Sequence, residues 1–142
     1  MDNGLIHRDL TNKIIGVFYE VYNELGFGFL ESVYEDAMVI ALEESGLQVE
    51  QQVAIPVLFR GRSLGNFGAD LIVDGSVIIE LKAVSRLVDA HIAQLMHYLR
   101  ATDIEVGLVM NFGQQPAFKR RVFENERKRS MGETSLIQNL LS

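Results

Sequence analysis

The chain has 142 residues, a net charge of −6 at neutral pH and no cysteine. This length suits one domain with a real buried core, and the lack of cysteine excludes disulfides, thiolate catalysis and thiolate metal sites. The N-terminus lacks the layout of a signal peptide, and no apolar run is long enough to cross a membrane. We therefore expect a single soluble, cytoplasmic domain over residues 1–142, with residues 125–142 as a peripheral or flexible tail.

The charges are unevenly distributed along the chain. Acidic residues dominate residues 1–50, whereas a basic strip lies within residues 117–130. The strip consists of Lys119, Arg120, Arg121, Arg127, Lys128 and Arg129. An acidic protein is poorly suited to coat nucleic acid without specificity, but a local strip can still contact phosphates. The strip is either a solvated segment, which is the usual behaviour of charge runs, or a contributor to nucleic-acid affinity.

Two helices are predicted at the start of the chain. Apolar residues recur at helical spacing over residues 10–25, and Gly26 and Gly28 end that pattern. A second amphipathic pattern covers residues 30–45 and stops at Gly46.

The apolar pattern then changes to the alternation of strands. Over residues 49–59 it predicts one set of side chains on a common face: Val49, Gln51, Val53, Ile55, Val57 and Phe59. The dipeptide Asp74-Gly75, a strong hairpin signal, joins predicted strands at 67–73 and 77–82. Residues 77–82 are apolar in succession, so we expect this strand to be central and buried on both faces.

The remaining elements complete the predicted architecture. A helix over residues 88–101 precedes a strand at 106–110, which indicates a crossover connection and a parallel strand pair. Residues 118–123 predict a short edge strand, and residues 135–141 predict a small terminal helix. The order predicts an α/β sandwich, in which a mixed sheet is flanked by helices.

Two carboxylates stand in strand patterns that disfavour them. Asp70 and Glu80 lie on the two strands of the predicted hairpin, close to opposite one another, and Lys82 shares a strand face with Glu80. Two close carboxylates repel unless a cation neutralises them, and oxygen ligands suit a hard divalent ion. The backbone carbonyl of Leu81 could be a further ligand, and Lys82 could orient a metal-bound water or offset phosphate charge. The alternative is a structural Asp–Lys–Glu salt-bridge set without metal.

Two predicted helices could add groups to this cluster. On the helix at 88–101, a polar stripe of His91, Gln94 and Tyr98 lies beside the apolar face, although such stripes are commonly hydrogen-bonded boundaries. On the earlier helix, Glu31 borders the apolar stripe and Glu35 has the weaker claim. By itself, Glu31 is more often an acid of the first helical turn, favoured by the helix dipole.

Several motifs resemble a known family. Ala69-Asp70, nine intervening residues and Glu80-Leu81-Lys82 resemble the PD-(D/E)XK nuclease signature, with alanine in place of its proline. The segment from Gly28 through Glu31 to Tyr34 resembles the motif of the GxxExxY proteins, a branch of that superfamily. The stretches HIAQLMHYLRA and GLVMNFG are also similar to that branch, and the resemblance covers roughly residues 7–123.

The resemblance implies a fold and a chemistry. The fold would be the restriction-endonuclease-like αβββαβ sandwich. Asp70 and Glu80 would bind Mg²⁺ or Mn²⁺, Glu31 would join them, and Lys82 would assist catalysis. Gln94 and Tyr98 resemble the Q-x₃-Y pair of nucleases that process DNA ends.

The implied function is metal-dependent hydrolysis of nucleic acid, DNA before RNA, by metal-bound water. The alternatives are a non-catalytic nucleic-acid- or protein-binding module on the same fold, or a nuclease active only with a partner. A homodimer or a separate protein partner stays open.

Overall fold

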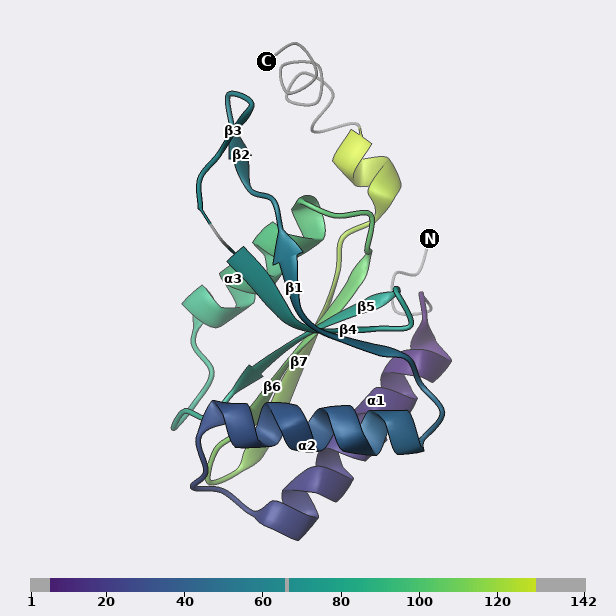
Figure 1. Cartoon of the computed structure of the whole chain (residues 1–142), viewed down its shortest axis with the longest axis vertical. Helices are drawn as coiled ribbons and strands as arrows, with labels where there is room; N and C mark the ends of the chain where they lie inside the picture. Colours follow the sequence, from purple (N-terminus) through teal and green to yellow (C-terminus); the bar gives the residue numbers. More distant parts are fainter. Residues whose placement is uncertain (1–5, 66, 130–142) are drawn as a thin grey trace.

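The computed structural model describes residues 6–65 and 67–129, which form a sheet with helices on both faces (Figure 1). The elements in chain order are α1 (Arg8–Leu25), α2 (Glu31–Glu44), β1 (Val49–Ile55), β2 (Leu58–Phe59), β3 (Arg62–Ser63), β4 (Phe67–Val73), β5 (Val77–Lys82), α3 (Asp89–Arg100), β6 (Val106–Phe112) and β7 (Pro116–Val122). The five-stranded sheet has the order β1-β4-β5-β6-β7, and β2 and β3 form a separate small hairpin. The predicted mixed sheet flanked by helices is confirmed.

Each face of the sheet has its own apolar core. Helices α1 and α2 cover one face, where Phe18 and Tyr34 pack on Phe112 of β6 with ring centroids 4.9 and 4.2 Å apart. Helix α3 covers the other face, where Leu95 and Leu99 are fully buried. The amphipathic stripes of the helices explain this arrangement, because each helix buries its apolar side against the sheet.

Strand β5 occupies the centre of the sheet, as its apolar run predicted. It pairs antiparallel with β4 and parallel with β6, and only Lys82 at its end escapes full burial. The turn before it contains Asp74 and Gly75, whose φ angles are 51° and 62°. Both residues therefore have the left-handed backbone that a tight hairpin turn requires, which is why this dipeptide was an effective signal.

Strand β1 departs from the predicted alternation at Gln52. Val49 packs in the core beneath α1 and α2, whereas Val53 and Ile55 pack in the core beneath α3. Gln52 has a φ of 52°, and this left-handed residue reverses which face the following side chains occupy. The prediction of one common face over residues 49–59 is therefore wrong, and β1 itself ends at Ile55.

The basic strip is partly used inside the fold. The Arg120 guanidinium donates to the Ile6 carbonyl and to the Thr11 hydroxyl on α1. The Lys128 ammonium donates to two backbone carbonyls in the α3–β6 loop, at 2.9 and 2.7 Å. These two residues stabilise the fold and do not form a solvated strip. The terminal helix predicted at 135–141 lies outside the described residues.

No helix within residues 6–65 and 67–129 is long and apolar enough to cross a bilayer.

Candidate functional site

The hydrogen-bond ladder between β4 and β5 stops at Asp70 and Glu80. Regular pairing runs from Val73↔Val77 to Leu71↔Ile79, and the next two residues along are the carboxylates. The Asp70 backbone N–H donates to Glu80 Oε2 at 2.8 Å, and the Leu81 backbone N–H donates to Asp70 Oδ2 at 2.7 Å. Each carboxylate thus accepts a hydrogen bond from the opposite strand, in place of a ladder bond. The structure brings together the two acids that the hairpin signal predicted to be neighbours.

Glu80 is the buried member of the pair, with 3% of its surface exposed. The pKa of Glu80 is raised from 4.5 to about 8, mainly by burial and next by the neighbouring Asp70 charge. The Asp70 amide and the Lys82 charge lower this pKa, and Glu35 raises it slightly. Without a cation, Glu80 therefore holds its proton at neutral pH.

Lys82 follows Glu80 by two residues and so shares its strand face. Its charge acts on Glu80, but the structure gives Lys82 no ion pair with either carboxylate. The alternative of a closed Asp–Lys–Glu salt-bridge set is therefore not what the described residues form.

The acid that α2 brings to the cluster is Glu35. Its carboxylate accepts hydrogen bonds from Gln51 and Gln52, both at 2.7 Å, and Gln52 also donates to Asp70 Oδ1 at 3.3 Å. Glu31 is exposed at the first position of α2, and no hydrogen bond joins it to the described cluster. Glu31 was expected at the site, but Glu35 lies one turn further along α2 and faces β1. The neighbouring amides of Gln51 and Gln52 in the sequence could have indicated that an acid of α2 would be hydrogen-bonded to β1.

Helix α3 contributes Gln94 and Tyr98. The Gln94 amide donates to the Tyr98 hydroxyl at 2.9 Å, as their four-residue spacing predicted. Burial raises the pKa of Tyr98, the hydrogen bond with Gln94 lowers it, and the charges of Glu80 and Asp70 raise it. Tyr98 is 3% exposed, so it belongs to the core as well as to the polar stripe. His91 does not take part in this pair: its imidazole accepts a hydrogen bond from the Val88 N–H at the start of α3.

Asn111 is a functional candidate that sequence reasoning missed. Its side chain accepts the Val84 N–H at 3.0 Å and donates to the Val84 carbonyl at 2.9 Å. These two bonds hold the loop that follows Lys82, so Asn111 helps to place the end of β5. Gly113 is needed beside it, because a Cβ there would approach the Val84 carbonyl to 2.5 Å. The sequence could have indicated this role, because Asn111 is a polar residue near the end of an apolar strand, and a buried amide there needs hydrogen-bond partners.

The glycine–glutamate–tyrosine motif closes the loop between α1 and α2. Gly28 has a φ of 112°, a conformation that other residues rarely adopt. The Tyr34 hydroxyl donates to the Gly26 carbonyl at 2.5 Å and accepts the Phe29 N–H at 3.2 Å. The glycine and the tyrosine of the motif are therefore structural in this chain, and they fix where α2 begins.

The donor set suits a hard divalent cation with few protein ligands. Within the described ranges, no three His, Asp or Glu side chains are grouped as a metal cage. Three of the four oxygens of Asp70 and Glu80 accept hydrogen bonds, whereas Glu80 Oε1 accepts none from the part of the chain that is described. Two repelling carboxylates with an open oxygen fit an ion such as Mg²⁺, which keeps several of its waters.

Comparison with known proteins gives a family and two similar structures. The chain is similar to the crystal structure of SSO0001, with 18% identity, a TM-score of 0.50 and coverage of 76% of this chain and 58% of that one. It is also similar to an alkaline exonuclease, LHK-Exo, from Laribacter hongkongensis, with 14% identity, a TM-score of 0.42 and coverage of 78% and 64%. This chain thus spans less than two thirds of either structure. No curated protein matches it.

The match that decides the family is one of sequence. A family model described as the PD-(D/E)XK nuclease superfamily matches residues 8–122, a range that runs from the start of α1 to the end of β7 and includes both carboxylates. This chain belongs to the PD-(D/E)XK nuclease superfamily.

Proposed function

We propose that this chain is a Mg²⁺-dependent nuclease that hydrolyses phosphodiester bonds in DNA, with Mn²⁺ as an effective substitute. The observation that most supports the proposal is the pairing of Asp70 and Glu80 where β4 and β5 part, each held by a backbone amide of the opposite strand. Membership of a nuclease superfamily whose members typically use divalent metal ions also supports it.

Asp70 and Glu80 would hold the ion, with the Leu81 carbonyl as a third oxygen ligand. Such an ion, when bound, supplies a nucleophilic water and stabilises charge on the phosphate. Glu80 has to lose the proton that its raised pKa retains before it can serve as a ligand, so cation binding is coupled to proton release.

The other groups have electrostatic and positioning roles. Lys82 makes no ion pair in the described structure, so its ammonium can offset negative charge that develops on the phosphate. Gln94 and Tyr98 present a hydrogen-bonded amide and hydroxyl toward the same site. Glu35, in place of Glu31, is the helix acid that would adjust the position of Asp70 through Gln52.

The finer family assignment rests on one motif. We propose that the chain belongs to the GxxExxY branch of the superfamily, because Gly28, Glu31 and Tyr34 match its motif. The backbone of Gly28 and the hydrogen bonds of Tyr34 support the proposal by giving two of these positions a structural role. We extend the assignment to one nuclease-like domain over residues 1–142.

A second candidate function is a binding module, or a nuclease completed by a partner protein. The specific observation in its favour is that no group of three His, Asp or Glu side chains that could hold a metal ion is found in the described residues. A partner or the substrate phosphate would then supply the missing ligands.

Calorimetry with Mn²⁺ tests the metal site. We expect weak binding by the parent and none by Asp70→Asn, because a site with so few protein ligands depends on each carboxylate. Asp74→Asn is the matched control, since it changes the same residue type at the far end of the same strand pair. Equal Mn²⁺ binding by the parent and Asp70→Asn would exclude Asp70 as a ligand. Cleavage of DNA by the parent, compared with Asp70→Asn purified in parallel, tests the activity.

A further inference from the structure

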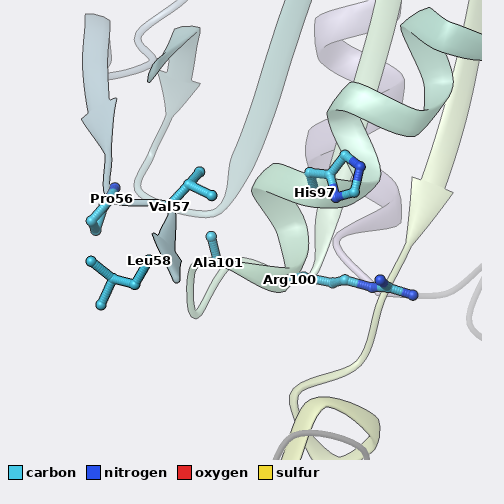
Figure 2. Close-up of a pocket in the computed structure, with 6 residues that line it drawn as sticks. All are labelled: Pro56, Val57, Leu58, His97, Arg100 and Ala101. Atoms are coloured by element: carbon cyan, nitrogen blue, oxygen red, sulfur yellow. The ribbon is translucent and has the colours of Figure 1, made fainter. Parts of the chain in front are cut away.

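A groove lies between α3 and the base of the β2–β3 hairpin. One hollow of about 400 Å³ is lined by Val57, Phe67, Gln94, His97 and Tyr98, among others. A second, of about 240 Å³, shares Val57 and His97 with it and continues toward the C-terminal end of α3. Figure 2 shows the second hollow, with Pro56, Val57 and Leu58 across from His97 and Ala101. The two hollows together are named the hairpin groove.

The hairpin groove adjoins the proposed active site. Phe67 of the groove and Asp70 of the proposed active site lie on the same strand, β4, and the hydrogen-bonded pair Gln94 and Tyr98 also lines the groove. A substrate bound at the two carboxylates could therefore extend along β4 to the groove.

The lining of the groove suits a flat aromatic ring. Phe67 is 40% exposed on β4, and the exposed imidazole of His97 comes from α3, while the almost completely buried Tyr98 also lines the hollow. Apart from Gln94 and Arg100, the other lining residues are apolar, and no acid within residues 6–65 and 67–129 lines either hollow. Aromatic side chains of this kind stack with nucleobases, whichever base is present.

The surroundings of the groove carry the charge that a nucleic-acid strand requires. Arg60 and Arg62 are exposed on the hairpin, and residues 53–65 contain no acid. By contrast, α2 on the other face of the sheet carries five acidic residues: Glu31, Glu35, Asp36, Glu43 and Glu44. Phosphates that flank a base in the groove would meet Arg60 and Arg62 on the hairpin and Arg100 in the lining, and would lie on the face of the sheet opposite the acidic α2.

We propose that the hairpin groove binds an unpaired nucleobase beside the proposed active site, so that the substrate class is single-stranded or frayed-end DNA. This inference rests on the proposed function. A base inside an intact duplex is stacked on both sides and cannot enter such a groove unless it is unpaired first.

Binding of three labelled oligonucleotides tests the proposal in the full-length Glu80→Gln protein, which cannot complete the reaction. The probes are a short thymidine strand, the same strand with abasic sites in place of its bases, and a blunt DNA hairpin. We expect the thymidine strand to bind most tightly. A Phe67→Ala/His97→Ala variant should bind it about tenfold more weakly, near the affinity for the abasic strand, because base stacking is lost while phosphate contacts stay.

Two further variants guard against a folding artefact. Ala93→Trp fills the groove without removing a contact, and it should reduce binding of the thymidine strand to a similar extent. Ile40→Ala truncates a 60% exposed side chain on α2, on the opposite side of the sheet, and should leave binding unchanged. Thermal unfolding of each variant shows that the protein is folded.

Each outcome separates this inference from the proposed function. Equal affinity for the thymidine and abasic strands, with no effect of the groove variants, would overturn the groove proposal, while DNA cleavage by the parent would leave the nuclease proposal standing. A parent that neither binds nor cleaves any oligonucleotide would overturn both. Groove variants that change sedimentation and not oligonucleotide binding would assign the groove to a second copy of the chain and overturn the proposal.

Discussion

The two halves of the β4–β5 hairpin differ in composition and in pairing. Near the turn, residues 71–73 and 77–79 form a regular ladder, and every one of these side chains is apolar and buried. One residue further from the turn, Asp70 and Glu80 interrupt the ladder, and their carboxylates accept the amides that β-pairing would have used. The same two strands thus provide a rigid apolar half and a charged, open half.

This difference shows how the fold holds two repelling acids together. Burial of the apolar half stabilises the hairpin. Because the two strands are held together there, the positions of Asp70 and Glu80 in the open half are fixed as well. The raised pKa of Glu80 is the electrostatic consequence. Substitutions in the two halves should therefore have separate effects. Those in the open half should reduce metal binding or the rate of DNA cleavage, and those in the apolar half should reduce the free energy of unfolding.

The largest effect is expected for Lys82→Ala in the open half. Removing one well-placed electrostatic contact should lower the cleavage rate about 10²–10³-fold, while Mn²⁺ binding persists or tightens because a nearby positive charge is gone. Single-turnover cleavage of labelled DNA and calorimetry measure the two quantities. Lys13→Ala, on the exposed surface of α1, is the matched control. The same trace activity in the parent, Lys82→Ala and Glu80→Ala would assign that activity to a contaminant and favour the binding or partner-dependent function.

Ile79→Ala tests the apolar half. Ile79 is completely buried in the ladder, so its truncation should lower the free energy of unfolding by about 2–5 kcal/mol through lost burial and a cavity. Urea unfolding measures this loss, and Ile40→Ala on the surface should show almost none. Cleavage by the folded variant should stay close to that of the parent. A stable but inactive Ile79→Ala protein would contradict the separation of the two halves.

Glu80→Gln should change the pH dependence of stability. Between pH 4.5 and about 8 the folded protein retains a proton on Glu80 that the unfolded chain has lost, so the metal-free parent loses stability as pH rises through this range. Glutamine does not titrate, so the variant should not show this decline, and above pH 8 it should be more stable than the parent by a few kcal/mol. Unfolding experiments over this pH range compare the two proteins. Parallel curves would show that Glu80 is not held protonated.

The smallest effect is expected for Gln52→Gly, beside the open half. Glycine relieves the left-handed backbone at φ 52°, which offsets the loss of the hydrogen bonds to Glu35 and Asp70. The free energy of unfolding should therefore stay within about 1 kcal/mol. We expect kcat to fall severalfold with KM unchanged, because Asp70 is held less firmly. Gln51→Ala, which loses a bond to Glu35 but none to Asp70, should retain kcat; an equal loss in both would contradict a positioning role for Gln52.

Much of this architecture is determined by the sequence itself. The helices, the β4–β5 hairpin, the central place of β5 and the proximity of Asp70 to Glu80 all follow from apolar periodicity and from the Asp74-Gly75 turn. These features are local, because they depend on residues close together along the chain.

Only the tertiary structure decided which distant residues complete the site. The left-handed backbone of Gln52 changes which face of the sheet the following side chains of β1 occupy. The Gln52 side chain itself donates hydrogen bonds to both Glu35 and Asp70. The hydrogen bonds of Glu35 to Gln51 and Gln52 depend on how α2 lies against β1. The hydrogen bonds of Lys128 depend on how the chain beyond β7 packs on the α3–β6 loop. Contacts between elements far apart in sequence leave no periodic signal, so the relative placement of these elements had to be seen in three dimensions.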